Sequence, residues 1–170
     1  MRSMHDEETM GAMPNLHHDA EQLQHEIEAA FANVQYPGDE RLVYDASGYH
    51  LECNEVLAAF KGKHWKDVSL ETLLYHSDGV YSFTPEAYRF YLPAYLLAGS
   101  LDYDRADMIP FTVVMSLIPP PDARDLTNYR LRMEGFTPGQ RRVIKSFLEF
   151  LKRHYSMDDP LGDIDRALQA

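Results

Sequence analysis

Apolar residues recur at three- and four-residue steps over several stretches of the chain, which is the spacing of one face of an amphipathic helix. The first stretch runs from Leu16 to Val34 and stops before the turn sequence that begins at Tyr36. Two shorter stretches span residues 52–61 and 69–76, and a glycine follows each within three residues. Glycine is favoured just past a helix end. The pattern therefore predicts three helices in the N-terminal half of the chain.

The segment that follows Phe83 predicts a buried central helix over residues 85–98. Thr84 suits the N-cap, Pro85 suits the first helical position, and Glu86 complements the positive end of the helix dipole. Apolar residues then surround most of the helix circumference, which is typical of a helix inside the fold. Pro93 lies within this helix and is expected to kink it.

Two more helices are predicted in the C-terminal half. Residues 108–118 form a short apolar run, for which Asp107 is the expected N-cap. Residues 137–140, with the sequence Thr-Pro-Gly-Gln, have the spacing of a capping box and start a helix predicted over 138–155. Between the two, residues 119–136 open with three prolines and read as a long connection with one helical turn near 124–130.

These elements predict an all-α fold: a compact single-domain helical bundle of about six helices around a central apolar helix kinked at a proline. Strand signals are few, and a minor β-hairpin near residues 41–50 stays an open alternative. The domain is expected over residues 16–155. Residues 1–15 hold four methionines without helical period and read as a disordered lead, and residues 156–170 read as an acidic tail.

The segment Phe-Thr-Pro-Glu-Ala-Tyr-Arg-Phe-Tyr-Leu-Pro-Ala-Tyr at residues 83–95 is unusual because an aromatic-rich helix rarely contains an internal proline. Together with Phe-Thr-Pro-Gly-Gln at 136–140 and Phe-Leu-Glu-Phe-Leu at 147–151, it resembles an uncharacterised bacterial family that carries only a domain-of-unknown-function label. The resemblance covers roughly residues 20–155. It implies a small, single-domain cytoplasmic protein and no catalytic residue.

The composition changes the picture through its charge. The 170 residues carry 27 acidic and 16 basic side chains, a formal net charge of −11. Such a chain is poorly suited to neutralise nucleic-acid phosphates or to lie on anionic lipid, so neither partner is expected. The charge is uneven: residues 130–155 carry seven basic and two acidic side chains, whereas the flanking segments are acidic. A basic protein partner fits this balance better than an acidic one.

A cytoplasmic location is expected from three features of the sequence. Cys53 is the single cysteine, so no disulfide can form within the chain. The first 14 residues have three consecutive acids and no apolar run, unlike a signal peptide. The apolar run at 108–118 has about half of the roughly 20 residues needed to span a bilayer.

The sequence contains no phosphate-binding loop, dinucleotide fingerprint or His-Glu-x-x-His motif, so no catalytic residue, metal or cofactor is predicted. His18, Glu21 and His25 share one helix face and could meet a metal ion, but a solvated helix surface is the favoured interpretation. Cys53 could act as a nucleophile with His50 or His64 as base, although a lone cysteine on an apolar helix face is more often core.

The predicted partner-binding surface consists of two acidic loops and one aromatic residue, which are Asp39, Glu40, Asp45, Asp102, Asp104, Asp107 and Trp65. Acidic loops of this kind meet basic partners, because complementary charge speeds the encounter. Trp65 is either core or an exposed anchor. The basic helix at 138–155 is expected to be the least suitable site for a basic partner.

The leading functional hypothesis is a non-enzymatic protein-binding protein, of the bacterial immunity or antitoxin type, that neutralises a basic toxin. The alternative is a small enzyme or ligand-binding protein that uses a cleft beside the kinked helix, formed by Glu86, Arg89, Tyr88 and Tyr91. A third hypothesis is a self-associating subunit, and the oligomeric state is left open.

Overall fold

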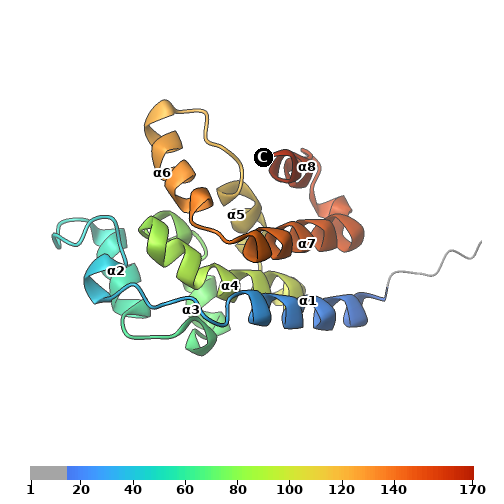
Figure 1. Cartoon of the computed structure of the whole chain (residues 1–170), viewed down its shortest axis with the longest axis horizontal. Coiled ribbons are helices and arrows are strands. Elements are labelled where there is room, and N and C mark those ends of the chain that lie inside the picture. The colour runs from blue at the N-terminus through green and yellow to red at the C-terminus, as the bar shows by residue number, and fades with distance from the viewer. Residues whose placement is uncertain (1–14) are drawn as a thin grey trace, which may run out of the picture.

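A computed structural model describes residues 15–170 and contains eight α-helices within that range, without a regular β-strand there (Figure 1). In chain order the helices are α1 (Leu16–Ala30), α2 (Leu51–Phe60), α3 (Leu70–Tyr75), α4 (Pro85–Leu101), α5 (Ile109–Ser116), α6 (Ala123–Glu134), α7 (Pro138–Tyr155) and α8 (Asp163–Gln169). Single 3₁₀ turns at Asp39–Arg41, Trp65–Asp67, Gly79–Tyr81, Tyr103–Arg105 and Ser156–Asp158 connect them. The predicted all-α single-domain fold is confirmed.

Helix α4 lies at the centre of the fold, and α1, α3, α5, α6 and α7 all pack against it (Figure 1). It begins as predicted: Thr84 Oγ1 accepts a hydrogen bond from the Ala87 backbone N–H at 3.1 Å. It runs through Pro93 to Leu101, three residues beyond the predicted end. The last turn contains Gly99, whose missing side chain leaves room for the ring of Phe147 on α7. Small residues thus let α7 approach the C-terminal end of α4 closely.

Three tyrosines of α4 use their hydroxyl groups to hold three different neighbours. All three side chains are buried, and none is more than 1% exposed. The Tyr88 hydroxyl lies 2.8 Å from Ser116 Oγ on α5. Burial away from water raises the pKa of Tyr88 to about 12, so this group stays a neutral hydroxyl.

The other two hydroxyls donate to backbone carbonyl oxygens. Tyr91 reaches the carbonyls of Phe60 and Lys63, each at 2.8 Å, where α2 ends and the next turn begins. Tyr95 donates to the carbonyl of His76, just past α3, at 2.8 Å. The Phe60 and His76 carbonyls also accept backbone N–H groups, from Lys63 at 3.0 Å and from Gly79 at 2.9 Å. Each phenol hydroxyl thus finds an acceptor near the end of a helix and adds a second hydrogen bond there.

The start of α7 is fastened to the end of α1 by one glutamine. Thr137 Oγ1 accepts from the Gln140 N–H at 3.1 Å, and Gln140 Oε1 accepts from the Thr137 N–H at 3.0 Å, which confirms the predicted capping box. The same Gln140 side chain donates to the carbonyl of Ala30, the last residue of α1, at 3.2 Å. Gln140 therefore satisfies groups at both helix ends.

The prediction that the first helix continues to Val34 is wrong at its C-terminal end. The helix ends at Ala30, and Phe31 turns into the core, where its ring meets Phe136 edge to face at 6.4 Å. The apolar periodicity continues past the helix because Val34 also packs against the core from the loop. Apolar spacing alone does not distinguish these two conformations.

Residues 119–136, predicted as a connection with one helical turn near 124–130, contain the 12-residue helix α6. Asp122 caps it by accepting a hydrogen bond from the Arg124 N–H at 2.9 Å. The helix is polar on most sides and buries only Tyr129 and Arg132, so it lacks the apolar stripe that predicts a helix. Its stability comes from packing beside α4.

The C-terminal segment is part of the fold and does not form a separate tail. Helix α8 packs on α5 and α7 and buries Ile164 and Ala167 (Figure 1). The predicted N-cap at Asp107 is also wrong: Met108 takes that position, and Asp107 has a positive φ of 48°. The possible hairpin is reduced to one isolated bridge between Val43 and Phe83. The lead predicted over 1–15 lies outside the described residues except for Asn15, which caps α1.

Replacement of Tyr95 by phenylalanine is expected to lower the free energy of unfolding by about 0.5–1.5 kcal/mol, because it removes one buried hydrogen bond and leaves the His76 carbonyl with the Gly79 N–H as its donor. Tyr75→Phe is the matched control, since Tyr75 is 76% exposed, and its effect should stay within about 0.5 kcal/mol. Urea denaturation of both variants measures the difference. Equal stabilities would show that the Tyr95 hydroxyl contributes nothing.

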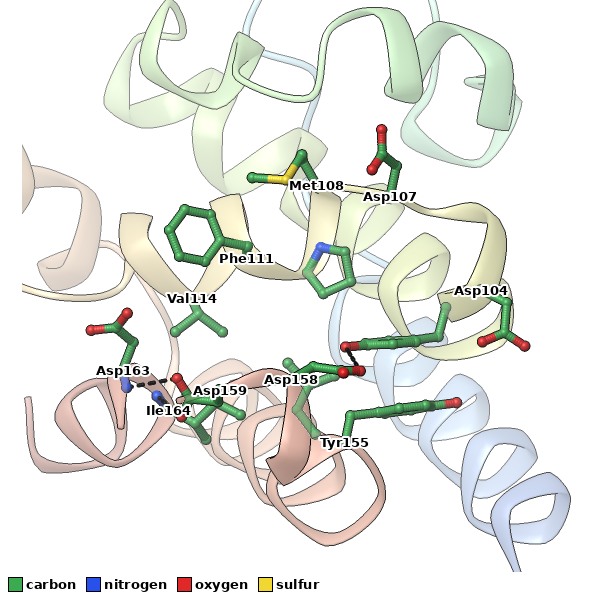
Figure 2. Close-up of a pocket in the computed structure, with 13 residues that line it drawn as sticks. Asp104, Asp107, Met108, Phe111, Val114, Tyr155, Asp158, Asp159, Asp163 and Ile164 are labelled. Atoms are coloured by element: carbon green, nitrogen blue, oxygen red, sulfur yellow. Dashed lines mark hydrogen bonds between the residues drawn. The ribbon is translucent and has the colours of Figure 1, made fainter. Parts of the chain in front are cut away.

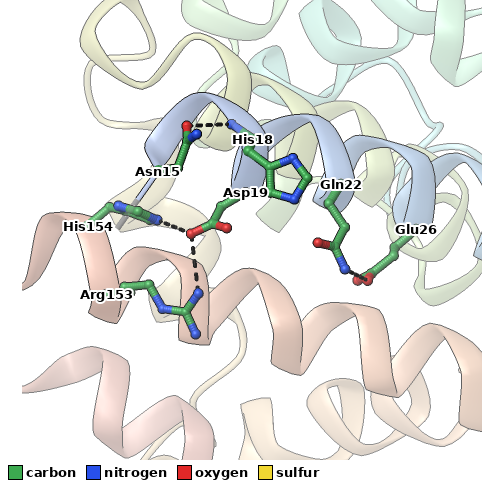
Figure 3. A network of polar contacts seen from close by, with 7 residues as sticks. All are labelled: Asn15, His18, Asp19, Gln22, Glu26, Arg153 and His154. Atoms are coloured by element: carbon green, nitrogen blue, oxygen red, sulfur yellow. Dashed lines mark hydrogen bonds and ion pairs between the residues drawn. The ribbon is translucent and has the colours of Figure 1, made fainter. Parts of the chain in front are cut away.

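Acid is expected to weaken the contact between α1 and α7. Asp19 Oδ2 lies 2.8 Å from His154 Nε2 and 3.2 Å from an Arg153 guanidinium nitrogen (Figure 3). The hydrogen bond with His154 is the main cause that lowers the pKa of Asp19 below its usual 3.8. A carboxyl whose pKa is lowered by folding stabilises the protein above its unfolded pKa, and that contribution is lost as the pH falls through its folded pKa.

Asp19→Asn should therefore destabilise the protein at neutral pH, and the difference from the wild type should shrink as the pH falls below 3.8. Thermal unfolding across this range measures it. The control is Asp67→Asn, which removes an exposed carboxylate on the 3₁₀ turn Trp65–Asp67 and should show no such pH dependence. A pH-independent effect of Asp19→Asn would contradict the assignment.

Candidate functional site

A groove of about 470 Å³ lies where α5, the C-terminal end of α7 and α8 meet (Figure 2). Thirteen residues line it, and five of them are aspartates: Asp104, Asp107, Asp158, Asp159 and Asp163. None of the thirteen is lysine, arginine or histidine. The groove is thus a concave surface of negative charge, of a size that accommodates a side chain or a short peptide segment.

Two stacked tyrosines form one side of the groove. The rings of Tyr103 and Tyr155 lie parallel with centroids 3.4 Å apart, and the Tyr103 hydroxyl donates to Asp158 Oδ2 at 2.9 Å (Figure 2). Burial, followed by the hydrogen bond with Asp158, raises the pKa of Tyr103 well above its usual 10. The hydroxyl therefore stays protonated and continues to hold the Asp158 carboxylate in place.

The opposite side is built by the first turn of α8. Asp159 accepts hydrogen bonds from the backbone N–H groups of Asp163 at 2.8 Å and Ile164 at 3.0 Å (Figure 2). Those donors have no partner within the helix, so the carboxylate serves as a cap placed ahead of the helix start. Asp163 is 5% exposed and forms an ion pair with Arg166 at 2.6 Å.

The third side of the groove has two carboxylates without a partner among the described side chains and two half-exposed apolar side chains. Asp104 and Asp107 are exposed and form no hydrogen bond or ion pair with any other described side chain. Met108 and Phe111 are each 49% exposed beside them, where Figure 2 shows both side chains along the α5 side of the groove. Exposed apolar groups surrounded by polar ones commonly mark interaction sites.

The acidic loops predicted as one surface are separated in the structure. Asp39 accepts from the Tyr36 hydroxyl, and Asp45 caps its own turn by accepting from Ser47, so both serve local structure. Glu40 lies in the same region, and none of the three lines the groove. Asp102 ends α4 and pairs with Arg105 at 3.7 Å. Asp104 and Asp107 are the two predicted residues that reach the groove.

Trp65 is 1% exposed, so the alternative that places it in the core is the correct one, and its assignment as a partner anchor is wrong. It stands at the start of the 3₁₀ turn Trp65–Asp67, which packs on α4. Lys66 Nζ lies 5.3 Å from the centre of its ring. Its face is therefore occupied by the protein's own side chains.

The residues of the predicted central cleft do not surround one cavity. Tyr88 and Tyr91 are buried with their hydroxyls engaged, whereas Glu86 pairs with Arg41 at 3.5 Å near the surface. Glu86 and Arg89, one turn apart on α4, form no ion pair with each other. Instead, an Arg89 guanidinium nitrogen donates to the carbonyl of Leu131 near the end of α6, at 3.0 Å.

The candidate metal and nucleophile residues have structural roles or face solvent. His18, Glu21 and His25 are exposed, and no group of three potential ligands forms within residues 15–170. Cys53 is fully buried, and the Nδ1 atom of His50 accepts from its backbone N–H at 3.3 Å, as the cap of α2. A buried thiol beside a capping histidine is not set up as a nucleophile.

The sequence does not single out Asp158, Asp159 and Asp163, because they fall in the segment 156–170 that is predicted to be an acidic tail. The signal that could have identified them is the short apolar pattern at Ile164 and Ala167, which predicts that this segment packs. The predicted helix 138–155 also contributes to the groove through Leu151 and Tyr155. None of the basic residues of this helix lines the groove, so the helix does not exclude a basic partner from this side.

Comparison with known proteins identifies a family without an assigned activity. A protein-family model described as a family of unknown function (DUF6714) matches residues 19–169, which includes α8. No curated protein and no solved structure matches the chain. In the part of the chain from residue 15 onward, none of the helices is long and apolar enough to cross a membrane.

The structural role of Arg89 can be tested through Gly135, which follows α6. A Cβ atom at Gly135 would lie 2.1 Å from the Arg89 guanidinium carbon, although the backbone there (φ −76°) suits any residue. Gly135→Ala should cost about 1 kcal/mol in the wild type, because the arginine must leave the Leu131 carbonyl. In an Arg89→Ala background the same change should stabilise by up to about 1 kcal/mol.

The matched control is Gly139→Ala in the first turn of α7, where an added Cβ meets no atom closer than 3.7 Å. It should have the same effect in both backgrounds, since the two sites share no contact. Chemical denaturation of the wild type, the three single variants and the two double variants measures the coupling. A Gly135→Ala effect that does not depend on Arg89 would contradict the contact.

Proposed function

Because the chain belongs to the family of unknown function DUF6714, whose description states no activity, we propose a function from the geometry of the groove. The protein binds a basic segment of another protein between α5, α7 and α8, and it does so without catalysis. The observation that carries this proposal is the lining of the groove, with five aspartates, no basic residue and two half-exposed apolar side chains.

Charge supports a basic partner. The exposed carboxylates of Asp104 and Asp107 have no partner among the described residues, so they keep their negative field for an incoming molecule. Complementary charge raises association rates by about 10- to 1,000-fold at low salt. The net charge of −11 adds to the attraction over longer distances.

Apolar surface supports a protein segment rather than a free cation. Phe111 and Met108 offer an aromatic ring and a flexible thioether beside the carboxylates. Interfaces are enriched in such residues at their centres, where they exclude water and slow dissociation. A segment with alternating basic and apolar side chains matches both halves of the groove.

The partner is proposed to be a basic toxin, which makes this chain an immunity or antitoxin-type protein of the bacterial cytoplasm. The lack of recognised catalytic motifs and the acidity of the chain support this assignment. A neutralising protein works by covering its target, so it needs a complementary surface and no reactive group.

The test uses the product of the neighbouring gene as the candidate partner. It should inhibit growth when expressed alone, and co-expression of this chain should restore growth. In purified complexes, Asp104→Asn combined with Asp107→Asn should lower the association rate by about tenfold at low salt and reduce its salt dependence. Phe111→Ala should instead speed dissociation by about tenfold or more, with little loss of stability because the ring is half exposed.

The matched control removes two exposed acids outside the groove, Asp67→Asn with Glu71→Gln. It should leave both rates near those of the wild type. A neighbouring protein that is neither toxic nor bound would refute the antitoxin role. If none of the groove substitutions changes the association or dissociation rate of the partner, the groove is not the binding surface.

A further inference from the structure

Arg132 on α6 is a buried cation without an anionic partner. Arg132 is 7% exposed, and its Nε–H group is buried with no hydrogen-bond acceptor. Across residues 15–170 no hydrogen bond or ion pair involves its guanidinium group. Arginine is almost never buried unless it is paired, because removal of a charge from water is costly.

The surroundings of Arg132 compensate that cost only in part. The guanidinium carbon lies 4.8 Å from the centre of the Tyr88 ring, whose face attracts a cation. The positive charge of Arg132 also acts on Tyr81: burial raises the pKa of Tyr81, and the nearby cation partly opposes that rise. Aromatic faces attract the charge but do not accept the in-plane N–H bonds of the guanidinium, which has five donors in a fixed fork.

Arg132 lines a cavity of about 620 Å³ between α5 and α6. Apolar walls come from Met115, Ile118 and the three consecutive prolines at 119–121. The buried hydroxyl of Ser116, whose residue is 1% exposed, lies in the same wall. The cavity therefore combines one unsatisfied cation with surfaces that suit the body of a small organic molecule.

The other charged groups of the cavity do not satisfy Arg132. Asp125 stands two turns earlier on α6, about 10 Å away along the helix axis, and is exposed. Arg166 is already paired with Asp163 at 2.6 Å. The unmet requirement at this site is thus for an oxyanion that accepts the two parallel N–H bonds of a guanidinium fork.

We propose that the cavity between α5 and α6 binds a small organic anion, whose carboxylate or phosphate group pairs with Arg132 and whose apolar part packs against Met115 and the proline segment. The site is separate from the acidic groove, and its ligand has the opposite charge to the proposed partner of that groove. It does not depend on the proposed function.

Benzoate and phenyl phosphate are the probes, each titrated against the full chain at constant ionic strength with chloride as the reference salt. Above the dissociation constant, each tenfold rise in probe concentration should raise the melting temperature by about 3–6 °C. The Nε–H signal of Arg132 in a ¹⁵N-correlated NMR spectrum should shift with the same midpoint. Whichever probe binds more tightly distinguishes a carboxylate ligand from a phosphate ligand.

Arg132→Lys keeps the charge but removes the fork, and it should weaken binding by about tenfold or more. Arg132→Met should abolish the response while the unliganded protein melts at the wild-type temperature or above, because an unpaired buried charge is removed. The control is Arg124→Met, which removes an exposed arginine from the same helix and should keep the full response.

If the Arg132→Met variant fails to fold, the Arg132→Lys titration and the wild-type Nε–H signal decide. Absence of a melting shift and of any Nε–H shift with both probes at 50-fold molar excess and above would overturn the proposal. An Arg132→Lys variant that responds as strongly as the wild type would also overturn it.

Discussion

The fold depends on the need to satisfy the phenol hydroxyls that α4 brings into the core. Tyrosine at positions 88, 91 and 95 adds large apolar area to the centre of the molecule, but each hydroxyl must find a partner there. The partners lie on α5, at the end of α2 and just past α3. One helix therefore sets where three neighbours end or turn, with a directional bond at each place.

Much of the helical fold could be predicted from the sequence, and the failures have physical causes. The capping groups at Thr84 and Thr137 act through their own backbone, so local sequence reveals α4 and α7. Helices α6 and α8 are stabilised by packing against the rest of the protein, and neither has a wide apolar stripe. Local apolar periodicity therefore gives no signal for α6 and only the short pattern at Ile164 and Ala167 for α8.

The candidate sites were less accessible to sequence reasoning because they are formed by distant segments. Asp104 and Asp158 are more than fifty residues apart in the sequence. The contacts of Tyr103 with Tyr155 and Asp158 bring them to the same groove. In the sequence, nothing distinguishes Arg132 from the other six basic residues of segment 130–155. What distinguishes it is burial without a partner, a property of the folded chain alone.

Helix α8 belongs to both sites at once. Asp163 lines the acidic groove, Arg166 lines the cavity of Arg132, and the two are joined by an ion pair within the same seven-residue helix. So short a helix, with few buried residues, has little local stability of its own. A molecule that binds only when α8 is docked therefore favours the docked state for the other site too. Such coupling would be reciprocal by thermodynamic linkage, so a ligand at either of the two proposed sites would strengthen binding at the other through α8.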